Sequence, residues 1–214
     1  MYDRDMDGVS AFVLAGGQSR RMGADKAFIE FNGSTLLARA LKLAEAVASE
    51  VWIVGHRQKF AEFGRVVEDE FPSHGPLGGI HAALRASSTD LNLVLAVDMP
   101  FVETRFLEYL LARAASGKAL ITVPRAGGGW QPLCAVYRKQ FVKVAEPALR
   151  KGRNKIDPLF APANVREVEE DELKNAGFSP DMFRNLNTQQ ELSEARKAGW
   201  AADQVSKIRP VPRI

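Results

Sequence analysis

Residues 14–27 read LAGGQSRRMGADKA and gather glycines, arginines and a lysine in one short stretch. Glycines lack a Cβ, so the backbone of such a turn can approach a ligand closely and direct its N–H groups at phosphate oxygens. Arg20, Arg21 and Lys26 add the positive charge that a triphosphate or a pyrophosphate needs. The stretch predicts a phosphate-binding loop, although a surface loop rich in glycine and arginine would have a similar composition.

Two aspartates fall where predicted strands end. Asp98 follows residues 91–97, the most strand-like segment of the chain, and Pro100 stops that strand. Asp69 closes a short strand at residues 65–69. Ligands of open α/β sheets bind beyond the carboxyl ends of the strands, so we expect both aspartates beside the glycine-rich loop. Asp98 is the candidate ligand for Mg²⁺, which binds through one or two carboxylates plus substrate phosphates. An aspartate at a strand end also commonly serves a turn.

The loop fits neither G-x-x-x-x-G-K-[ST] nor G-x-G-x-x-G. Residues 14–26 instead resemble the signature L-A-G-G-x-S-x-R-M-G-x-D-K of the molybdenum cofactor guanylyltransferases, a family of nucleotidyltransferases. The resemblance covers residues 9–198 and implies an enzyme that transfers GMP from GTP to molybdenum-bound molybdopterin, with Mg²⁺ as cofactor. The products would be the guanine dinucleotide form of the cofactor and pyrophosphate. Transient contacts with cofactor-supplying and acceptor proteins are implied as well.

The resemblance also implies roles for individual residues. Arg21, Lys26 and Asp98 would be catalytic, and Asp98 would hold the metal. Lys26 would neutralise phosphate charge as that charge shifts toward the leaving pyrophosphate. The implied nucleotide-binding positions are Leu14, Ala15, Gly16, Gly17, Lys26, Asp69 and Asp98.

The acceptor side of the cleft is implied by two further elements. Gln131 lies in a Q-P-L element, and Asn185 and Asn187 lie in an N-x-N-T element. The asparagines immediately precede a predicted helix at residues 188–198, so a helix N-cap and a turn are the alternative reading of them. The chain departs from the pattern at residues 54–57, which read VGHR where some members have an asparagine near the ribose.

Strand and helix patterns alternate along the chain, which predicts an α/β, Rossmann-like nucleotidyltransferase fold with a mostly parallel central sheet and helices on both faces. A length of 214 residues favours a single domain, expected over residues 9–200 between a flexible N-terminus (1–8) and a loosely ordered tail (201–214). The predicted strands are residues 9–14, 51–54, 65–69, 91–97, 119–124, 130–138 and 165–169, and the predicted helices are residues 35–48, 75–86, 103–115, 139–150 and 188–198.

The composition favours a cytoplasmic protein that handles small anions. A single cysteine, Cys134, excludes an internal disulfide and lies in an apolar strand, where packing is the expected role. No apolar run approaches the roughly 18 residues of a membrane span, and the acidic N-terminus is not a signal peptide. A net charge of +3 gives little support for nucleic-acid binding. Neither a membrane nor a nucleic acid is therefore an expected partner.

Other functions stay open at this point. Cytidylyl-transferring relatives tend to carry Ala-Gly where this chain has Gly16-Gly17, which favours guanine. A related enzyme that uses CTP or another phosphorylated acceptor is the alternative. A nucleotide-binding carrier that has lost turnover is a second alternative, although binding alone would tolerate the loss of Asp98 more easily.

Overall fold

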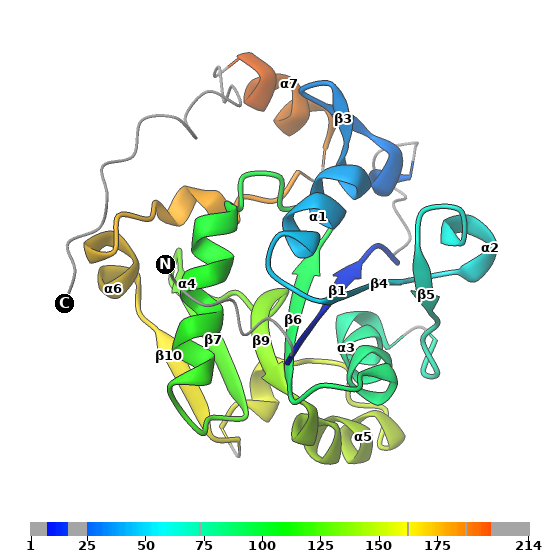
Figure 1. Cartoon of the computed structure of the whole chain (residues 1–214), viewed down its shortest axis with the longest axis vertical. Coiled ribbons are helices and arrows are strands. Elements are labelled where there is room, and N and C mark those ends of the chain that lie inside the picture. The colour runs from blue at the N-terminus through cyan, green and yellow to red at the C-terminus, as the bar shows by residue number, and fades with distance from the viewer. Residues whose placement is uncertain (1–7, 17–24, 73, 162, 187, 198–214) are drawn as a thin grey trace.

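The computed structural model describes residues 8–16, 25–72, 74–161, 163–186 and 188–197. Residues 1–7 of the predicted flexible N-terminus and the whole predicted tail (201–214) lie outside these residues. The centre of the fold is a sheet in the strand order β10-β7-β9-β6-β1-β4-β5, with β8 paired to β7 (Figure 1). Its strands are β1 (Val9–Leu14), β4 (Glu50–Val54), β5 (Arg65–Val67), β6 (Leu91–Ala96), β7 (Ile121–Ala126), β8 (Gly129–Trp130), β9 (Cys134–Arg138) and β10 (Val165–Val168).

Most of these strands run in one direction. β1 pairs in parallel with β4 and β6, β4 with β5, and β7 with β10. β9 is antiparallel to both of its neighbours, β6 and β7, so β7 and β10 keep the direction of β6. The predicted mostly parallel sheet is confirmed, and its carboxyl ends meet at one edge.

Helices cover both faces of the sheet, and successive side chains of β1 point to opposite faces, so that both faces are buried. Ala11 and Val13 belong to one apolar cluster, whereas Phe12 and Leu14 belong to the other. The first cluster includes residues of α1 and α4, and the second includes residues of α3 and α5 (Figure 1). The helices are α1 (Leu36–Glu45), α2 (Arg57–Phe60), α3 (Gly75–Ala86), α4 (Thr104–Ala115), α5 (Val142–Arg150), α6 (Glu170–Asn175) and α7 (Gln189–Lys197).

Several expected boundaries differ from those found. The expected strand over residues 130–138 is two strands, β8 and β9, because a turn at Gln131–Leu133 separates them. The expected helix over residues 35–48 ends at Glu45, and the expected strand over residues 65–69 ends at Val67. The strand expected over residues 119–124 is displaced to Ile121–Ala126.

Short elements were missed altogether by the sequence analysis. A hairpin of β2 (Glu30–Phe31) and β3 (Ser34–Thr35) turns at Asn32 and Gly33, which have φ of 50° and 77°. An Asn-Gly pair between strands is a strong hairpin signal, so this one was readable. The helices α2 and α6, and the 3-10 turns η1 (Lys26–Phe28), η2 (Lys139–Phe141), η3 (Asp157–Leu159) and η4 (Pro180–Phe183), are too short to show a helical period.

Within the described ranges, none of the helices has the length and apolar character needed to cross a membrane.

Candidate active site

The carboxyl ends of β1 and β6 lie side by side. The amide of Val97 donates to the carbonyl of Leu14 at 3.1 Å, and the amide of Ala96 donates to the carbonyl of Leu133 at 2.7 Å. Asp98 therefore emerges beside the end of β1, where the glycine-rich loop begins, and beside the chain that enters β9. The structure brings Leu14 and Asp98 together as the sequence predicted.

Lys26 and Asp98 form an ion pair at this edge. Nζ of Lys26 lies 2.9 Å from Oδ2 of Asp98, and the side chains are only 22% and 18% exposed. Lys26 opens the 3-10 turn η1, which Asp25 caps by accepting a hydrogen bond from the Ala27 amide at 3.1 Å. Asp25 also forms an ion pair with Lys59 of α2. Two residues predicted to be catalytic are thus in direct contact. The turn that carries Lys26 is held by the Asp25 cap and by the ion pair of Asp25 with Lys59.

The turn after Asp98 is held by two other elements. Arg39 of α1 donates from Nε to the carbonyl of Pro100 at 2.5 Å. The amide of Leu186 donates to the carbonyl of Asp98 at 3.0 Å. The Asp98 side chain points to Lys26 rather than capping the following helix, and α4 has no side-chain cap. Asp98 is therefore not a cap of the following helix.

The amides at the start of the glycine-rich loop are directed at the sheet. The N–H groups of Ala15 and Gly16 both donate to the carbonyl of Val54, at 3.1 and 3.0 Å. In this structure β4 accepts from the Gly16 amide, and the donation of this amide to a phosphate stays a prediction. Gly17 and Arg21 lie outside the described residues.

Asp69 is fixed at the start of α3. It accepts a hydrogen bond from the Phe71 amide at 2.7 Å. A Cβ added to Gly78 would lie 2.4 Å from Oδ2 of Asp69, so this glycine makes room for the carboxylate. Burial raises the pKa of Asp69 above its ordinary value, and the Phe71 amide and the nearby His81 and His74 oppose that rise.

Gln131 lies at the same edge of the sheet but uses its amide within its own hairpin. Its Nε2 donates to the carbonyl of Ala126 at 3.1 Å, and its backbone amide donates to the carbonyl of Pro124 at 2.9 Å. The side chain therefore shapes the β7–β8 turn.

Asn185 lies next to Leu186, which binds the backbone of Asp98. Its Oδ1 is buried and has no hydrogen-bond partner among the residues that the structure describes. Thr188 and Glu191 cap α7 reciprocally: the Glu191 amide donates to Thr188 Oγ1 at 3.1 Å, and the Thr188 amide donates to Glu191 Oε2 at 2.9 Å. The cap thus belongs to Thr188, and the reading of Asn185 as an N-cap is wrong. Asn187 lies outside the described residues.

The donor set fits a magnesium ion that arrives with its nucleotide. In the part of the chain that the structure describes, no three or more His, Cys, Asp or Glu residues are arranged to hold a metal. Mg²⁺ commonly uses one or two carboxylates and takes its other ligands from phosphates and water. Asp98, a partly buried carboxylate held beside a lysine, suits that arrangement.

Cys134 has the packing role expected from the sequence. It is fully buried in β9, and burial raises the pKa of its thiol to about 12. The thiol therefore stays protonated near neutral pH and is a poor nucleophile.

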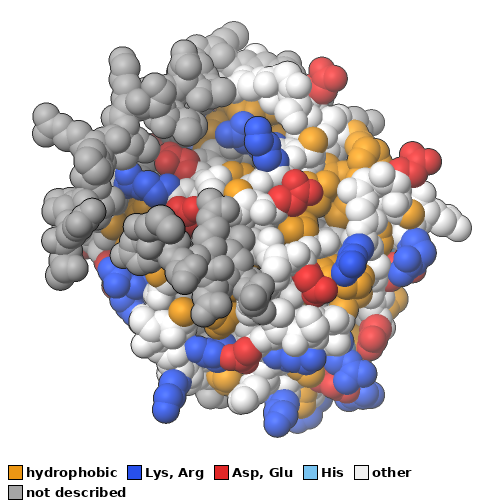
Figure 2. Space-filling model, in the orientation of Figure 1, with side chains coloured by type: hydrophobic (Ala, Val, Ile, Leu, Met, Phe, Trp, Pro, Cys, Tyr) orange, Lys and Arg blue, Asp and Glu red, His pale blue; other side chains and the backbone are white. Residues whose placement is uncertain are grey.

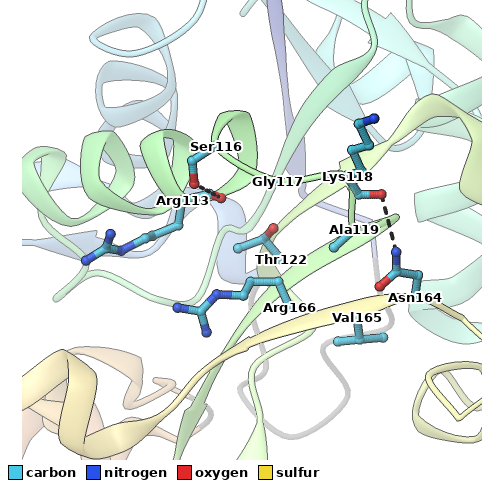
Figure 3. A pocket seen from close by; sticks show the side chains of 9 residues that line it. All are labelled: Arg113, Ser116, Gly117, Lys118, Ala119, Thr122, Asn164, Val165 and Arg166. Atoms are coloured by element: carbon cyan, nitrogen blue, oxygen red, sulfur yellow. Dashed lines mark hydrogen bonds between the residues drawn. The ribbon is translucent and has the colours of Figure 1, made fainter.

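A cavity of about 350 Å³ lies at the opposite edge of the sheet (Figure 3). Residues at the amino ends of β7 and β10 and at the end of α4 line it, among them Arg113, Lys118 and Arg166. Glu172 pairs with both arginines. On the molecular face seen in Figure 2, acidic and basic side chains are interspersed. The cavity is remote from the Lys26–Asp98 pair and is not the candidate active site.

Two contacts at the site were not foreseen. Asp25 was readable, because it belongs to the signature and precedes a lysine, but its pairing with Lys59 required the fold. Arg39 carries no sequence signal, since its position in a regular amphipathic helix resembles that of any solvated arginine.

Comparison with known proteins identifies the family of the chain. Residues 11–166 match the family model of the MobA-like NTP transferase domain. A probable molybdenum cofactor guanylyltransferase of Pelotomaculum thermopropionicum is 36% identical over 186 residues, which cover 86% of this chain and 90% of the relative. The molybdenum cofactor guanylyltransferase of Syntrophotalea carbinolica is 32% identical over 194 residues, covering 89% and 91%.

A solved structure has the same architecture. The molybdopterin-guanine dinucleotide biosynthesis protein A of Archaeoglobus fulgidus superposes with a TM-score of 0.77 at 27% identity, covering 88% of this chain and 97% of that one. The fold class expected from the sequence is confirmed. The chain belongs to the molybdenum cofactor guanylyltransferase family, with a MobA-like NTP transferase domain.

Proposed function

We propose that this protein transfers GMP from GTP to the phosphate of molybdenum-bound molybdopterin. The product is molybdopterin guanine dinucleotide cofactor, and pyrophosphate is released. The membership of the family supports this activity. The single observation that carries it is the Lys26–Asp98 ion pair at the carboxyl edge of the sheet, next to the end of the strand that enters the signature loop.

The reaction is an in-line displacement at the α-phosphorus of GTP. An acceptor phosphate oxygen forms the new P–O bond while the bond to the β-phosphate oxygen breaks and its electrons leave with pyrophosphate. The second pKa of a phosphomonoester is about 6, so the acceptor is already anionic near neutral pH and needs no general base. Positioning and charge stabilisation therefore carry the catalysis.

Lys26 and Asp98 have different roles in this charge stabilisation. Lys26 is poised to exchange its ion pair with Asp98 for the phosphate oxygens of GTP, where charge develops as pyrophosphate leaves. Arg21, which lies in the same signature, is proposed to add a second cation. Asp98 would hold Mg²⁺, which supplies neutralisation of the phosphate charge when it is bound.

The nucleotide and the acceptor are proposed to lie on different sides of Asp98. Leu14, Ala15, Gly16, Gly17 and Asp69 would contact GTP, and Asn185 and Asn187 would contact the acceptor. Gln131 is assigned a supporting role on the acceptor side, because its amide holds the β7–β8 turn. Because the product is labile, we also propose transient contacts with the proteins that supply and receive the cofactor.

The test is pyrophosphate release from GTP in the presence of molybdopterin, molybdate and Mg²⁺, with CTP and ATP as controls. Release that requires both GTP and the pterin is expected. Release with CTP instead would assign the protein to cytidylyl transfer. Nucleotide binding without release from any of the three would mean that the chain binds but does not transfer.

A further inference from the structure

Arg39 is a half-buried cation at the candidate site. It lies in the first turn of α1, and its Nε donates to the carbonyl of Pro100, two residues beyond Asp98. No carboxylate of the described residues pairs with its guanidinium. Burial lowers the pKa of Arg39, because desolvation disfavours its charged form.

Several other arginines have an acidic partner, whereas Arg57 and Arg105, like Arg39, donate to backbone carbonyls. Arg113 and Arg166 share Glu172, and Arg125 pairs with Glu167. Desolvated charges are normally compensated by a counter-charge, because an unpaired one costs free energy. Among the described residues, the partner of the Arg39 guanidinium is a neutral carbonyl on Nε, and we infer that the outer part of its planar fork can take an anion.

Arg184 stands at the same turn. It is exposed, its guanidinium carbon lies 5.9 Å from the ring centroid of Phe101, and no carboxylate of the described residues pairs with it. The segment that carries it is fixed to the turn by the hydrogen bond from Leu186 to Asp98. In Figure 1, this segment leads into α7 beside the loop that follows β6. Two cations therefore contact the consecutive residues Pro100 and Phe101.

We propose that Arg39 and Arg184 form an anion subsite at the Asp98 turn that binds the phosphate group of the acceptor substrate. The assignment to the acceptor rests on the proposed function. Arginine presents paired donors that match phosphate oxygens. In-line displacement requires the attacking phosphate to lie opposite the leaving pyrophosphate. Lys26 reaches Asp98 from the end of the signature loop, whereas Arg39 and Arg184 come from two other elements, α1 and the segment before α7.

The first test measures binding of inorganic phosphate by calorimetry, without acceptor, in the presence and absence of saturating GTP and Mg²⁺. The variants are Arg39→Met and Arg184→Met, and Arg166→Met is the matched control at the opposite edge. Because hydrogen bonds to a charged group are strong, we expect phosphate affinity to fall about tenfold to a hundredfold in Arg39→Met and about tenfold in Arg184→Met. The control should bind as the wild type does.

Thermal unfolding is measured for each variant beforehand, because Arg39→Met also removes the hydrogen bond to Pro100. If that variant does not fold, Arg184→Met decides alone, since its side chain is exposed. Wild-type phosphate affinity in the folded variants would overturn the subsite. If GTP displaces the bound phosphate, the assignment to the acceptor is overturned, and both arginines would instead bind the triphosphate.

Steady-state kinetics separates this proposal from the proposed function. In a wild-type enzyme that releases pyrophosphate, the variants should raise the KM for molybdopterin about tenfold and leave the KM for GTP unchanged. An equal rise in both constants would contradict an acceptor subsite. A wild type that binds phosphate through these arginines but releases no pyrophosphate would disprove the transfer reaction and leave the subsite standing.

Discussion

Lys26 and Asp98 lie 72 positions apart in the sequence, yet Nζ of the lysine contacts Oδ2 of the aspartate at 2.9 Å. The pair joins the end of the signature loop to the end of β6. Both side chains are partly exposed, so the pair contributes little to stability, within about 1 kcal/mol. The proposed function assigns phosphate binding to Lys26 and the metal to Asp98, so we expect the contact to serve the reaction rather than stability.

Asp98→Asn is therefore expected to lower kcat/KM for GTP by about a hundredfold to a thousandfold, because it removes the proposed ligand of the Mg²⁺ that would neutralise the developing charge. Lys26→Met should have an effect of similar size. Thermal unfolding should change little in either variant. The control is Lys174→Met, which breaks a comparable ion pair with Glu170 on α6. Full activity of Asp98→Asn at saturating Mg²⁺ would show that this carboxylate does not hold the metal.

Gly78 offers a way to displace Asp69 without changing it. A Cβ at this position would lie 2.4 Å from the Asp69 carboxylate, a distance at which atoms must shift. Gly78→Ala is expected to raise the KM for GTP about tenfold, as loss of a hydrogen bond to a charged group would. Alanine favours a helix by about 1 kcal/mol over glycine, so the stability cost should be small.

The control for this variant is Gly117→Ala, where an added Cβ meets nothing within 4 Å. It should leave the KM for GTP as it is. An unchanged KM in Gly78→Ala as well would argue that Asp69 plays no part in binding the nucleotide.

The raised pKa of Asp69 predicts a pH dependence. Burial disfavours its ionised form, so protonation begins at a higher pH than for an ordinary carboxyl group. If the carboxylate binds GTP, the KM for GTP should rise as the pH falls below neutral. In Asp69→Asn the KM for GTP should be high at every pH and should lack the rise that protonation of Asp69 causes. Any pH dependence that remains in this variant comes from other groups, among them GTP itself.

The same shift has a consequence for stability. Because the folded-state pKa is the higher one, the folded state binds more protons, and stability falls as the pH rises through the two pKa values. Asp69→Asn should then be at least as stable as the wild type at neutral pH by thermal unfolding. Lower stability of the variant at neutral pH would contradict an ionisation cost at this site.

The sequence predicted the parts of the fold that have strong local signals. The apolar run of β1 and the Gly-Pro start of α3 gave the bounds Val9–Leu14 and Gly75–Ala86 correctly. The convergence of Leu14, Asp69 and Asp98 on one edge followed from parallel strand order. The ion pairs of Lys26 and Asp25 and the position of Arg39 depend on packing between distant elements, which local patterns do not encode.

Competition for hydrogen-bond partners bears on two predictions. A glycine-rich turn permits phosphate binding, but in this structure the end of β4 accepts from the Gly16 amide, so the contact of this amide with a phosphate stays a prediction. An asparagine before a helix favours an N-cap, but Thr188 and Glu191 form a reciprocal pair that satisfies the same amides. In both cases the residue type indicated which kind of contact to expect, but the sequence did not indicate the partner.

Asn185 provides the last prediction, since its buried Oδ1 has no hydrogen-bond partner in the described part of the chain. An unsatisfied buried acceptor lowers stability by about 1–3 kcal/mol, and such a group in a native structure calls for an explanation. A donor from the acceptor substrate would provide one. Asn185→Leu should therefore raise the KM for molybdopterin at least about tenfold while leaving the KM for GTP unchanged. Its thermal stability should match or exceed that of the wild type.

The matched control is Asn175→Leu, at an exposed position near the end of α6, which should change neither KM. Loss of stability in Asn185→Leu together with unchanged kinetics would instead mean that the amide serves the fold. The first outcome combines unchanged or higher stability with a raised KM for molybdopterin. The second combines lower stability with an unchanged KM. Because the amide adjoins the residue that anchors Asp98, either result also reports on the segment that brings Arg184 to the site.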